Sequence, residues 1–173
     1  MDKYGTIIAP GTIRFERMLH GSIKEVWAYL TESEKRSKWL AKGEMELFEG
    51  GNVSLHFLHE ELSPIPDSPP EKYKHMKLGH SFTGKVLKIN PPYLLSFSWE
   101  GGSEVTFELK EIEDKVLLIL THQKLSEKKT RISVASGWHT HLNILIANLD
   151  GEVPSGFWKS YEHIKTIYSS LYK

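Results

Sequence analysis

Alternating apolar and polar residues predict that much of this chain forms β-strands. Residues 12–19 place Ile13, Phe15 and Leu19 on one side together with Arg17, which is typical of a half-buried strand. Short turns such as Gly50-Gly51 separate later apolar stretches, and turns of this kind join antiparallel strands. We therefore expect a seven-stranded antiparallel sheet, whose other six strands cover residues 44–48, 52–58, 81–89, 93–99, 105–112 and 116–123.

Two short helices are predicted after the first strand. Ser22 and Glu25 have the spacing of a capping box. Thr31 and Glu34 repeat this signal, so we expect a second helix to begin there. The first helix shows an apolar face at helical spacing, formed by Ile23, Val26, Trp27 and Leu30.

The longest predicted element is a helix over about residues 131–149. Apolar residues recur there at helical spacing, and Gly151 is a suitable stop. At 1.5 Å per residue this helix is about 28 Å long, enough to cross a whole sheet. A further amphipathic helix is expected within 155–172, with its cap near Ser155. The order of elements predicts one α+β domain over residues 1–173.

Residues 60–79 form a long excursion between strands. Its four prolines all lie within residues 64–70 and disfavour a regular strand or helix there. Loops of this length serve as lids or binding segments, or are plain mobile connections. The sequence leaves both alternatives open.

The charge balance disfavours a polyanionic partner. Lys and Arg together number 22, as do Asp and Glu, and there is no cysteine. We therefore expect no nucleic-acid partner, no disulfide and no thiol chemistry. No apolar run approaches the roughly 20 residues of a membrane span, and a cytoplasmic location is expected. Lys128, Lys129 and Arg131 lie near the start of the long helix, where positive charge is mildly unfavourable unless an anion binds. The alternative, which the sequence favours, is a solvated charged loop.

His139 and His141 are candidates for chemistry. Residues two apart on a helix point about 200° from each other, so this pair cannot share one metal. His56, His59 and Glu60 do not have the order of a metalloprotease motif, and phosphate-binding and serine-nucleophile motifs are lacking too. We expect no metal, no cofactor and no covalent catalysis. One of His139 and His141 can still line a pocket.

Several separated matches give the chain a family resemblance. They span about residues 11–151 and are Arg17-Met-Leu19, Glu25-Val-Trp-x-x-Leu-Thr31, Trp39, Gly50-Gly51, Gly84-Lys-Val86, Pro91-Pro92, Glu108-Leu109, Gly137-Trp138, Leu142, Leu145, Leu149 and Gly151. In this order and spacing they resemble the activator of heat-shock protein 90 ATPase homologue family, within the START-like, polyketide-cyclase-like (SRPBCC) superfamily. The 60–79 excursion and the helix after Gly151 depart from the family pattern.

The resemblance implies a helix-grip fold, in which the sheet wraps around the long helix. It also implies an apolar cavity between them that binds hydrophobic small molecules such as lipids. The long apolar helix and the strand meander support the same cavity. The candidate lining residues are Trp39, Phe57, Phe97, Trp99, Phe107, Trp138, His141, Leu142, Leu145 and Ile146.

Three functions follow from this fold. The first is binding of a small hydrophobic ligand without clear catalytic machinery. The second is a cyclase or hydrolase acting on a hydrophobic substrate, with His141, Glu108 or His122 as acid or base. The third, implied by the family resemblance, is a co-chaperone-like protein that regulates an ATPase. The protein partners to consider are a chaperone and a second copy of the chain.

Overall fold

The computed structural model describes the whole chain, from Met1 to Lys173. Seven strands form one antiparallel sheet in the order β1-β2-β7-β6-β5-β4-β3. The predicted seven-stranded antiparallel sheet is therefore confirmed. The strands are β1 Thr6–Ala9, β2 Thr12–His20, β3 Asn52–Phe57, β4 His80–Asn90, β5 Leu94–Ser98, β6 Glu104–Ile112 and β7 Lys115–Gln123.

One of the seven strands differs from the prediction. Residues 44–48 make only an isolated bridge, between Met45 and Val53. Gly43 has a φ of +135°, outside the range of an extended strand, and a Cβ there would lie 2.0 Å from the carbonyl oxygen of Ser54. Gly43 therefore interrupts the extended backbone directly before residues 44–48. The seventh strand is instead β1, at the sheet edge beside β2.

Two short helices follow β2, as predicted. In α1, Ile23–Thr31, the Ser22 hydroxyl accepts the backbone N–H of Glu25 at 3.2 Å, which confirms the first cap. The second predicted cap is wrong. The Thr31 hydroxyl donates to the carbonyl of Trp27 instead, and α2, Ser33–Arg36, begins without a side-chain cap.

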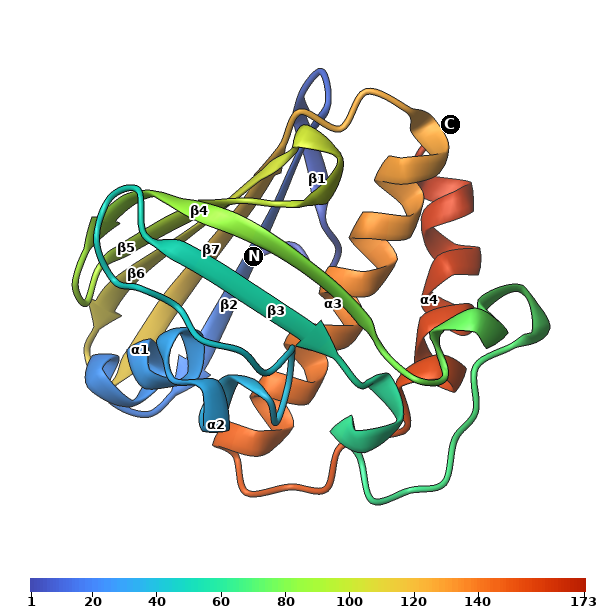
Figure 1. Cartoon of the computed structure of the whole chain (residues 1–173), viewed down its shortest axis with the longest axis horizontal. Helices are drawn as coiled ribbons and strands as arrows, with labels where there is room; N and C mark the ends of the chain where they lie inside the picture. The colour runs from blue at the N-terminus through green and yellow to red at the C-terminus, as the bar shows by residue number, and fades with distance from the viewer.

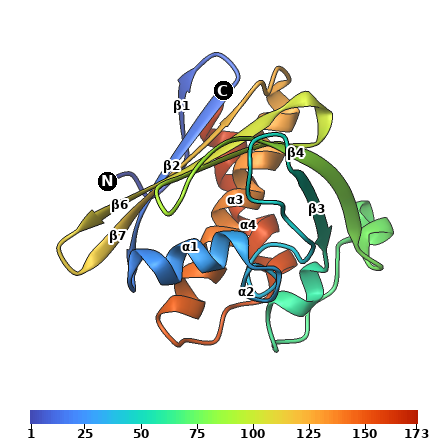
Figure 2. The same cartoon turned by 60° about the vertical axis from the view of Figure 1, so that its left-hand side comes forward.

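The sheet curls around α3, Lys128–Leu149, which lies along its concave face (Figures 1 and 2). This confirms the helix-grip arrangement, although α3 begins three residues before the predicted start. The additional helix is α4, Phe157–Leu171, with Gly156 rather than Ser155 at its cap. It packs beside α3, on the side away from the sheet in Figure 1.

The 60–79 excursion contains short 3₁₀ turns. They are η1, His59–Leu62, and η2, Glu71–Met76, and a third turn, η3, Glu100–Gly102, joins β5 to β6. Figure 1 shows η2 beside the first turns of α4. The excursion therefore lies against the additional helix.

Helix α4 also fixes the N-terminal segment. The hydroxyl of Tyr168 accepts the N–H of Gly5 at 2.7 Å, and that of Tyr172 donates to the carbonyl of Gly5 at 2.8 Å. Nδ1 of His139, on α3, lies 2.8 Å from the same Tyr168 hydroxyl. These bonds set the position of α4 relative to both α3 and the first strands.

One hydrophobic core of 35 buried residues connects the sheet with α1, α3 and α4. Its largest fully buried members include Trp39, Phe15, Phe97 and Phe107. None of the helices combines the length and apolar character that crossing a membrane requires.

Candidate functional site

A cavity of about 280 Å³ lies where the first half of α3 faces the end of β3, the start of β4, the excursion and α4. Eleven of the 17 residues around it are hydrophobic. We call it the aromatic pocket. It is lined by Leu40, Phe57, His59, Tyr73, Met76, His80, Phe82, Trp99, Glu100, Ser133, Val134, Gly137, Trp138, His141, Phe157, Trp158 and Tyr161.

Aromatic rings from the sheet and α3 form one wall of the pocket. Strand alternation puts Phe57 of β3 and Phe82 of β4 on the inner face of the sheet. The ring of Trp99 lies 4.7 Å from Phe82 and 5.1 Å from Trp138, measured between centroids. Edge-to-face and tilted pairs at such distances add stability beyond their buried area. This wall is therefore an apolar surface of packed aromatic rings.

The opposite wall comes from α4 and the excursion. Tyr73 of η2 stacks on Trp158 with centroids 5.3 Å apart. Its hydroxyl lies 3.2 Å from that of Tyr161. Phe157 packs against His141 of α3 at 4.8 Å. The two features that depart from the family pattern thus close the pocket together.

Two neutral histidines line the pocket. Nδ1 of His141 donates to the carbonyl of Trp39 at 2.7 Å, so its Nε2 carries a lone pair and has no partner in the protein. Burial lowers the pKa of His141 to about 4. Burial, with the nearby His141 and His80, lowers the pKa of His59 to about 3. Nδ1 of His59 is buried without a hydrogen-bond partner.

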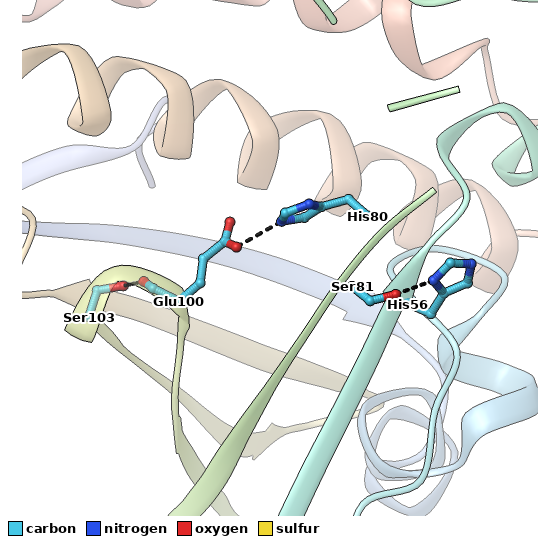
Figure 3. Close-up of polar contacts among 5 residues, drawn as sticks. All are labelled: His56, His80, Ser81, Glu100 and Ser103. Atoms are coloured by element: carbon cyan, nitrogen blue, oxygen red, sulfur yellow. Dashed lines mark hydrogen bonds and ion pairs between the residues drawn. The ribbon is translucent and has the colours of Figure 1, made fainter. Parts of the chain in front are cut away.

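A histidine–carboxylate pair lies at the mouth of the pocket. Nε2 of His80 is 2.7 Å from Oε2 of Glu100, and both side chains are more than a third exposed. Figure 3 shows the two pointing toward each other from β4 and η3. Ser81, the next residue on β4, points to the other face, where its hydroxyl bonds His56 of β3. Only His80 of these two β4 residues faces the pocket.

A buried hydrogen-bond chain positions the Trp138 ring and the η3 turn. The indole N–H of Trp138 donates to Nδ1 of His122 at 2.9 Å. Nε2–H of His122 then donates to the Ser103 hydroxyl at 2.8 Å, which donates to the carbonyl of Glu100 at 3.0 Å. Burial lowers the pKa of His122 to about 3. His122 supports the pocket from behind and does not line it.

Gly137 leaves space in the pocket wall. It lies within α3, and a Cβ built on it would meet no atom within 4 Å. Glycine inside a helix costs about 1 kcal/mol relative to alanine. A residue that weakens the helix therefore faces the cavity and keeps it open.

The pocket differs in position from the predicted cavity. Four of the ten candidate residues line it, namely Phe57, Trp99, Trp138 and His141. The other six lie outside the lining, because side chains fill the space under the second half of α3. Trp39 and Phe107, for example, pack edge to face with centroids 6.4 Å apart. The six are Trp39, Phe97, Phe107, Leu142, Leu145 and Ile146.

Other residues named as candidates also take defined places. Of the acid–base candidates, His141 lines the pocket, whereas Glu108 and His122 do not. His139 lies outside the pocket and bonds Tyr168. Nowhere do three or more His, Asp or Glu side chains gather as a metal ion would require.

Comparison with known proteins places the chain in a family. The family model described as Activator of Hsp90 ATPase homolog 1-like protein matches residues 20–150. A solution structure of a protein from Bordetella parapertussis is 36% identical, with a TM-score of 0.82, and the match covers 97% of this chain and 90% of that one.

More distant structures share the fold. CalU16 from Micromonospora echinospora is 23% identical with a TM-score of 0.67, over 93% of this chain and 88% of that one. A conserved protein of unknown function from Enterococcus faecalis is 20% identical with a TM-score of 0.67, and the match covers 96% of this chain and 89% of that one. A search of curated proteins gave no match. The family model and the 36% identical structure show that the chain belongs to the Activator of Hsp90 ATPase homolog 1-like family.

Proposed function

We propose that this protein binds a small aromatic molecule in the aromatic pocket. The observation that carries the proposal is a cavity of about 280 Å³ with eleven hydrophobic residues among its 17 lining residues. This volume is near the lower end of the roughly 300–1,000 Å³ typical of ligand sites. At about 30 Å³ per liquid water, it holds roughly nine waters. A ligand of about ten non-hydrogen atoms fits this space.

The polar groups of the pocket favour a ligand with a hydroxyl group. The free Nε2 lone pair of His141 accepts a hydrogen bond, because its Nδ1–H is already bonded to Trp39. With a pKa of about 4, His141 is neutral near pH 7 and keeps this lone pair available. 2-Naphthol, a bicyclic aromatic with one hydroxyl, is therefore a suitable probe.

The binding test uses the fluorescence of the three tryptophans that line the pocket, Trp99, Trp138 and Trp158. Titration of the protein with 2-naphthol should quench this fluorescence in a saturable way. Gly137→Leu should abolish the quenching, because its side chain enters the cavity. Asn143→Leu, on an exposed position of the same helix, is the matched control and should bind like the unchanged protein.

Two results would contradict the proposal. One is a linear, unsaturated fluorescence change with 2-naphthol. The other is saturable binding that survives in a folded Gly137→Leu variant, because the probe would then bind elsewhere. Circular dichroism of both leucine variants establishes that they remain folded.

The His80–Glu100 pair supports a second candidate function, acid–base catalysis on a hydrophobic substrate. A carboxylate that orients an imidazole beside a bound substrate is a common arrangement for a general base. This function would be supported if the protein converts aromatic esters or polyketide-like substrates, and if His80→Gln abolishes the conversion but retains ligand affinity. Equal turnover by the His80→Gln variant would remove it.

A chaperone partner, a second copy of the chain and a cytoplasmic location stay predictions. The description of the family names an activator of the Hsp90 ATPase, and this supports the chaperone partner. Stimulation of the cognate chaperone's ATPase by the purified protein tests it, and an unchanged ATPase rate would remove it.

A further inference from the structure

Four lysines surround a second hollow next to the aromatic pocket. Lys72 comes from η2, Lys128 and Lys129 from the first turn of α3, and Lys165 from α4. Together with Ile132 and Ser169 they line a space of about 360 Å³. We call it the basic hollow.

The positive charge of the basic hollow is not balanced by ion pairs. None of its four lysines has a carboxylate within salt-bridge distance, since the salt bridges of the structure involve other residues. Glu162 acts on Lys165 only at longer range. In a chain with 22 basic and 22 acidic residues, this is a local excess of charge. An anion would relieve it.

The ammonium groups are also crowded together. Close side-chain contact with Lys165 lowers the pKa of Lys72. The pKa of Lys165 is raised, despite its partial burial, by its contacts with the Tyr73 hydroxyl and Lys72. Lys128 and Lys129 begin a 22-residue helix whose first turn contains no acidic residue. Its cap residue is Glu127, whose side chain makes no hydrogen bond to the helix end. The partial positive charge of this helix end adds to that of the lysines.

Tyr73 belongs to both sites. Its ring lines the aromatic pocket and stacks on Trp158. Lys165 donates to its hydroxyl at 2.7 Å. The ammonium groups of Lys72 and Lys165 lie 5.6 Å and 5.2 Å from its ring centroid. One aromatic side chain therefore links the aromatic pocket to the basic hollow.

We propose that the two sites bind a single ligand, an aromatic molecule that carries a phosphate-like anionic group. The aromatic part occupies the aromatic pocket, and the anionic group lies beside Tyr73 on the lysines of the basic hollow. This inference rests on the proposed function, because it needs a ligand in the aromatic pocket. It adds the charge of that ligand and the residues that select it.

The test compares three probes with the full chain, in a buffer free of phosphate. They are 2-naphthol, 2-naphthyl phosphate and inorganic phosphate alone, each followed by calorimetry. At low salt, 2-naphthyl phosphate should bind about tenfold more tightly than 2-naphthol, because charge-assisted hydrogen bonds to the lysines outweigh the hydrogen bond to His141 that the ester cannot donate. About 0.5 M salt should remove most of this gain, because exposed charges are screened.

A double variant tests the lysines directly. Lys128→Gln with Lys129→Gln should lose most of the gain for 2-naphthyl phosphate and keep the affinity for 2-naphthol. Both side chains are exposed and make no hydrogen bond, so the fold should be unchanged. Lys24→Gln with Lys110→Gln removes two exposed charges elsewhere. This matched control should keep the full gain.

The outcomes separate this inference from the proposed function. If 2-naphthol binds and 2-naphthyl phosphate binds no more tightly, the single-ligand inference is overturned and the aromatic pocket stands. The single-ligand inference is also overturned if the Lys128/Lys129 variant still binds 2-naphthyl phosphate more tightly than 2-naphthol by the full factor. A third outcome would show two independent sites. In it, phosphate and 2-naphthol bind at the same time without competing, and 2-naphthyl phosphate binds no more tightly than 2-naphthol. If neither aromatic probe binds, the proposed function has failed.

Discussion

Buried histidines should make the folded protein sensitive to mild acid. Burial lowers the pKa of His59 and His122 to about 3, and that of His139 and His141 to about 4. In the unfolded chain a histidine has a pKa of about 6.5. Below that pH the unfolded state binds protons that the folded state does not, so the free energy of unfolding decreases as the pH is lowered. The loss begins near pH 6.5 and continues toward the folded values.

The size of the effect follows from the pH interval. At pH 5 the solution is about 1.5 units below the unfolded pKa, and each unit is worth about 1.36 kcal/mol. One buried histidine therefore costs about 2 kcal/mol at pH 5, and four cost about 8 kcal/mol. A protein of this size has a total stability of about 5–15 kcal/mol. We expect these histidines to bring the protein close to unfolding near pH 5.

His122→Gln isolates one of the four histidines. The glutamine oxygen can accept from the indole of Trp138 and its amide can donate to Ser103, so both bonds of His122 have replacements. The free energy of unfolding is measured by urea titration at pH 7, 6 and 5. Between pH 7 and 5 the variant should lose about 2 kcal/mol less than the unchanged protein. His163→Gln, at an exposed position, is the control.

The reasoning is refuted if His122→Gln and the unchanged protein lose the same stability between pH 7 and 5. That result would mean that His122 takes up its proton in the folded state. If His122→Gln does not fold, His139→Gln provides the same measurement, because Gln can also bond the Tyr168 hydroxyl.

Three further predictions concern stability at neutral pH. Tyr168→Phe should lower the free energy of unfolding by about 1–3 kcal/mol, because Gly5 and His139 lose a buried hydrogen-bond partner. Urea titration measures this loss. Tyr93 is nearly half exposed, so Tyr93→Phe should change the free energy of unfolding little and serves as the control. Ser22→Ala should cost about 1 kcal/mol through the lost cap, and Ser126→Ala in an exposed loop serves as its control. Gly137→Ala should raise the melting temperature by about 2–4 °C, since alanine stabilises a helix by up to about 1 kcal/mol; a fall would mean that the cavity wall does not tolerate a methyl group.

The fold could be predicted where local pattern and tertiary packing agree. Residues 12–19 and the helix around Trp138 have clear periodicity, and both were placed correctly. Strand β1 was missed because Ile7 and Ile8 are both about half exposed, so no alternation marks it. The prediction of a strand at 44–48 is wrong because Gly43 interrupts the ladder. A pattern of apolar and polar side chains does not show how the backbone at Gly43 lies against that of Ser54.

The site was harder to predict than the fold. Phe57, Trp138 and His141 lie on regular elements whose inner faces the periodicity reveals, and Trp99 directly follows β5. His59 and Tyr73 lie in the excursion, and no repeat shows which way their rings point. The aromatic residues at the start of α4 were a usable signal, because Phe157, Trp158 and Tyr161 form one apolar face. Their contact with the excursion depends on long-range packing.

The position of α4 has a consequence for biosynthesis. The residues that match the family model, 20–150, leave the ribosome before Phe157–Leu171. Until α4 emerges, His59 and His141 lack their contacts with Phe157 and Trp158, and Gly5 lacks its tyrosine partners. The nascent chain therefore exposes aromatic surface during this interval, which is when such surfaces promote aggregation. The second wall of the aromatic pocket is therefore in place only after α4 docks.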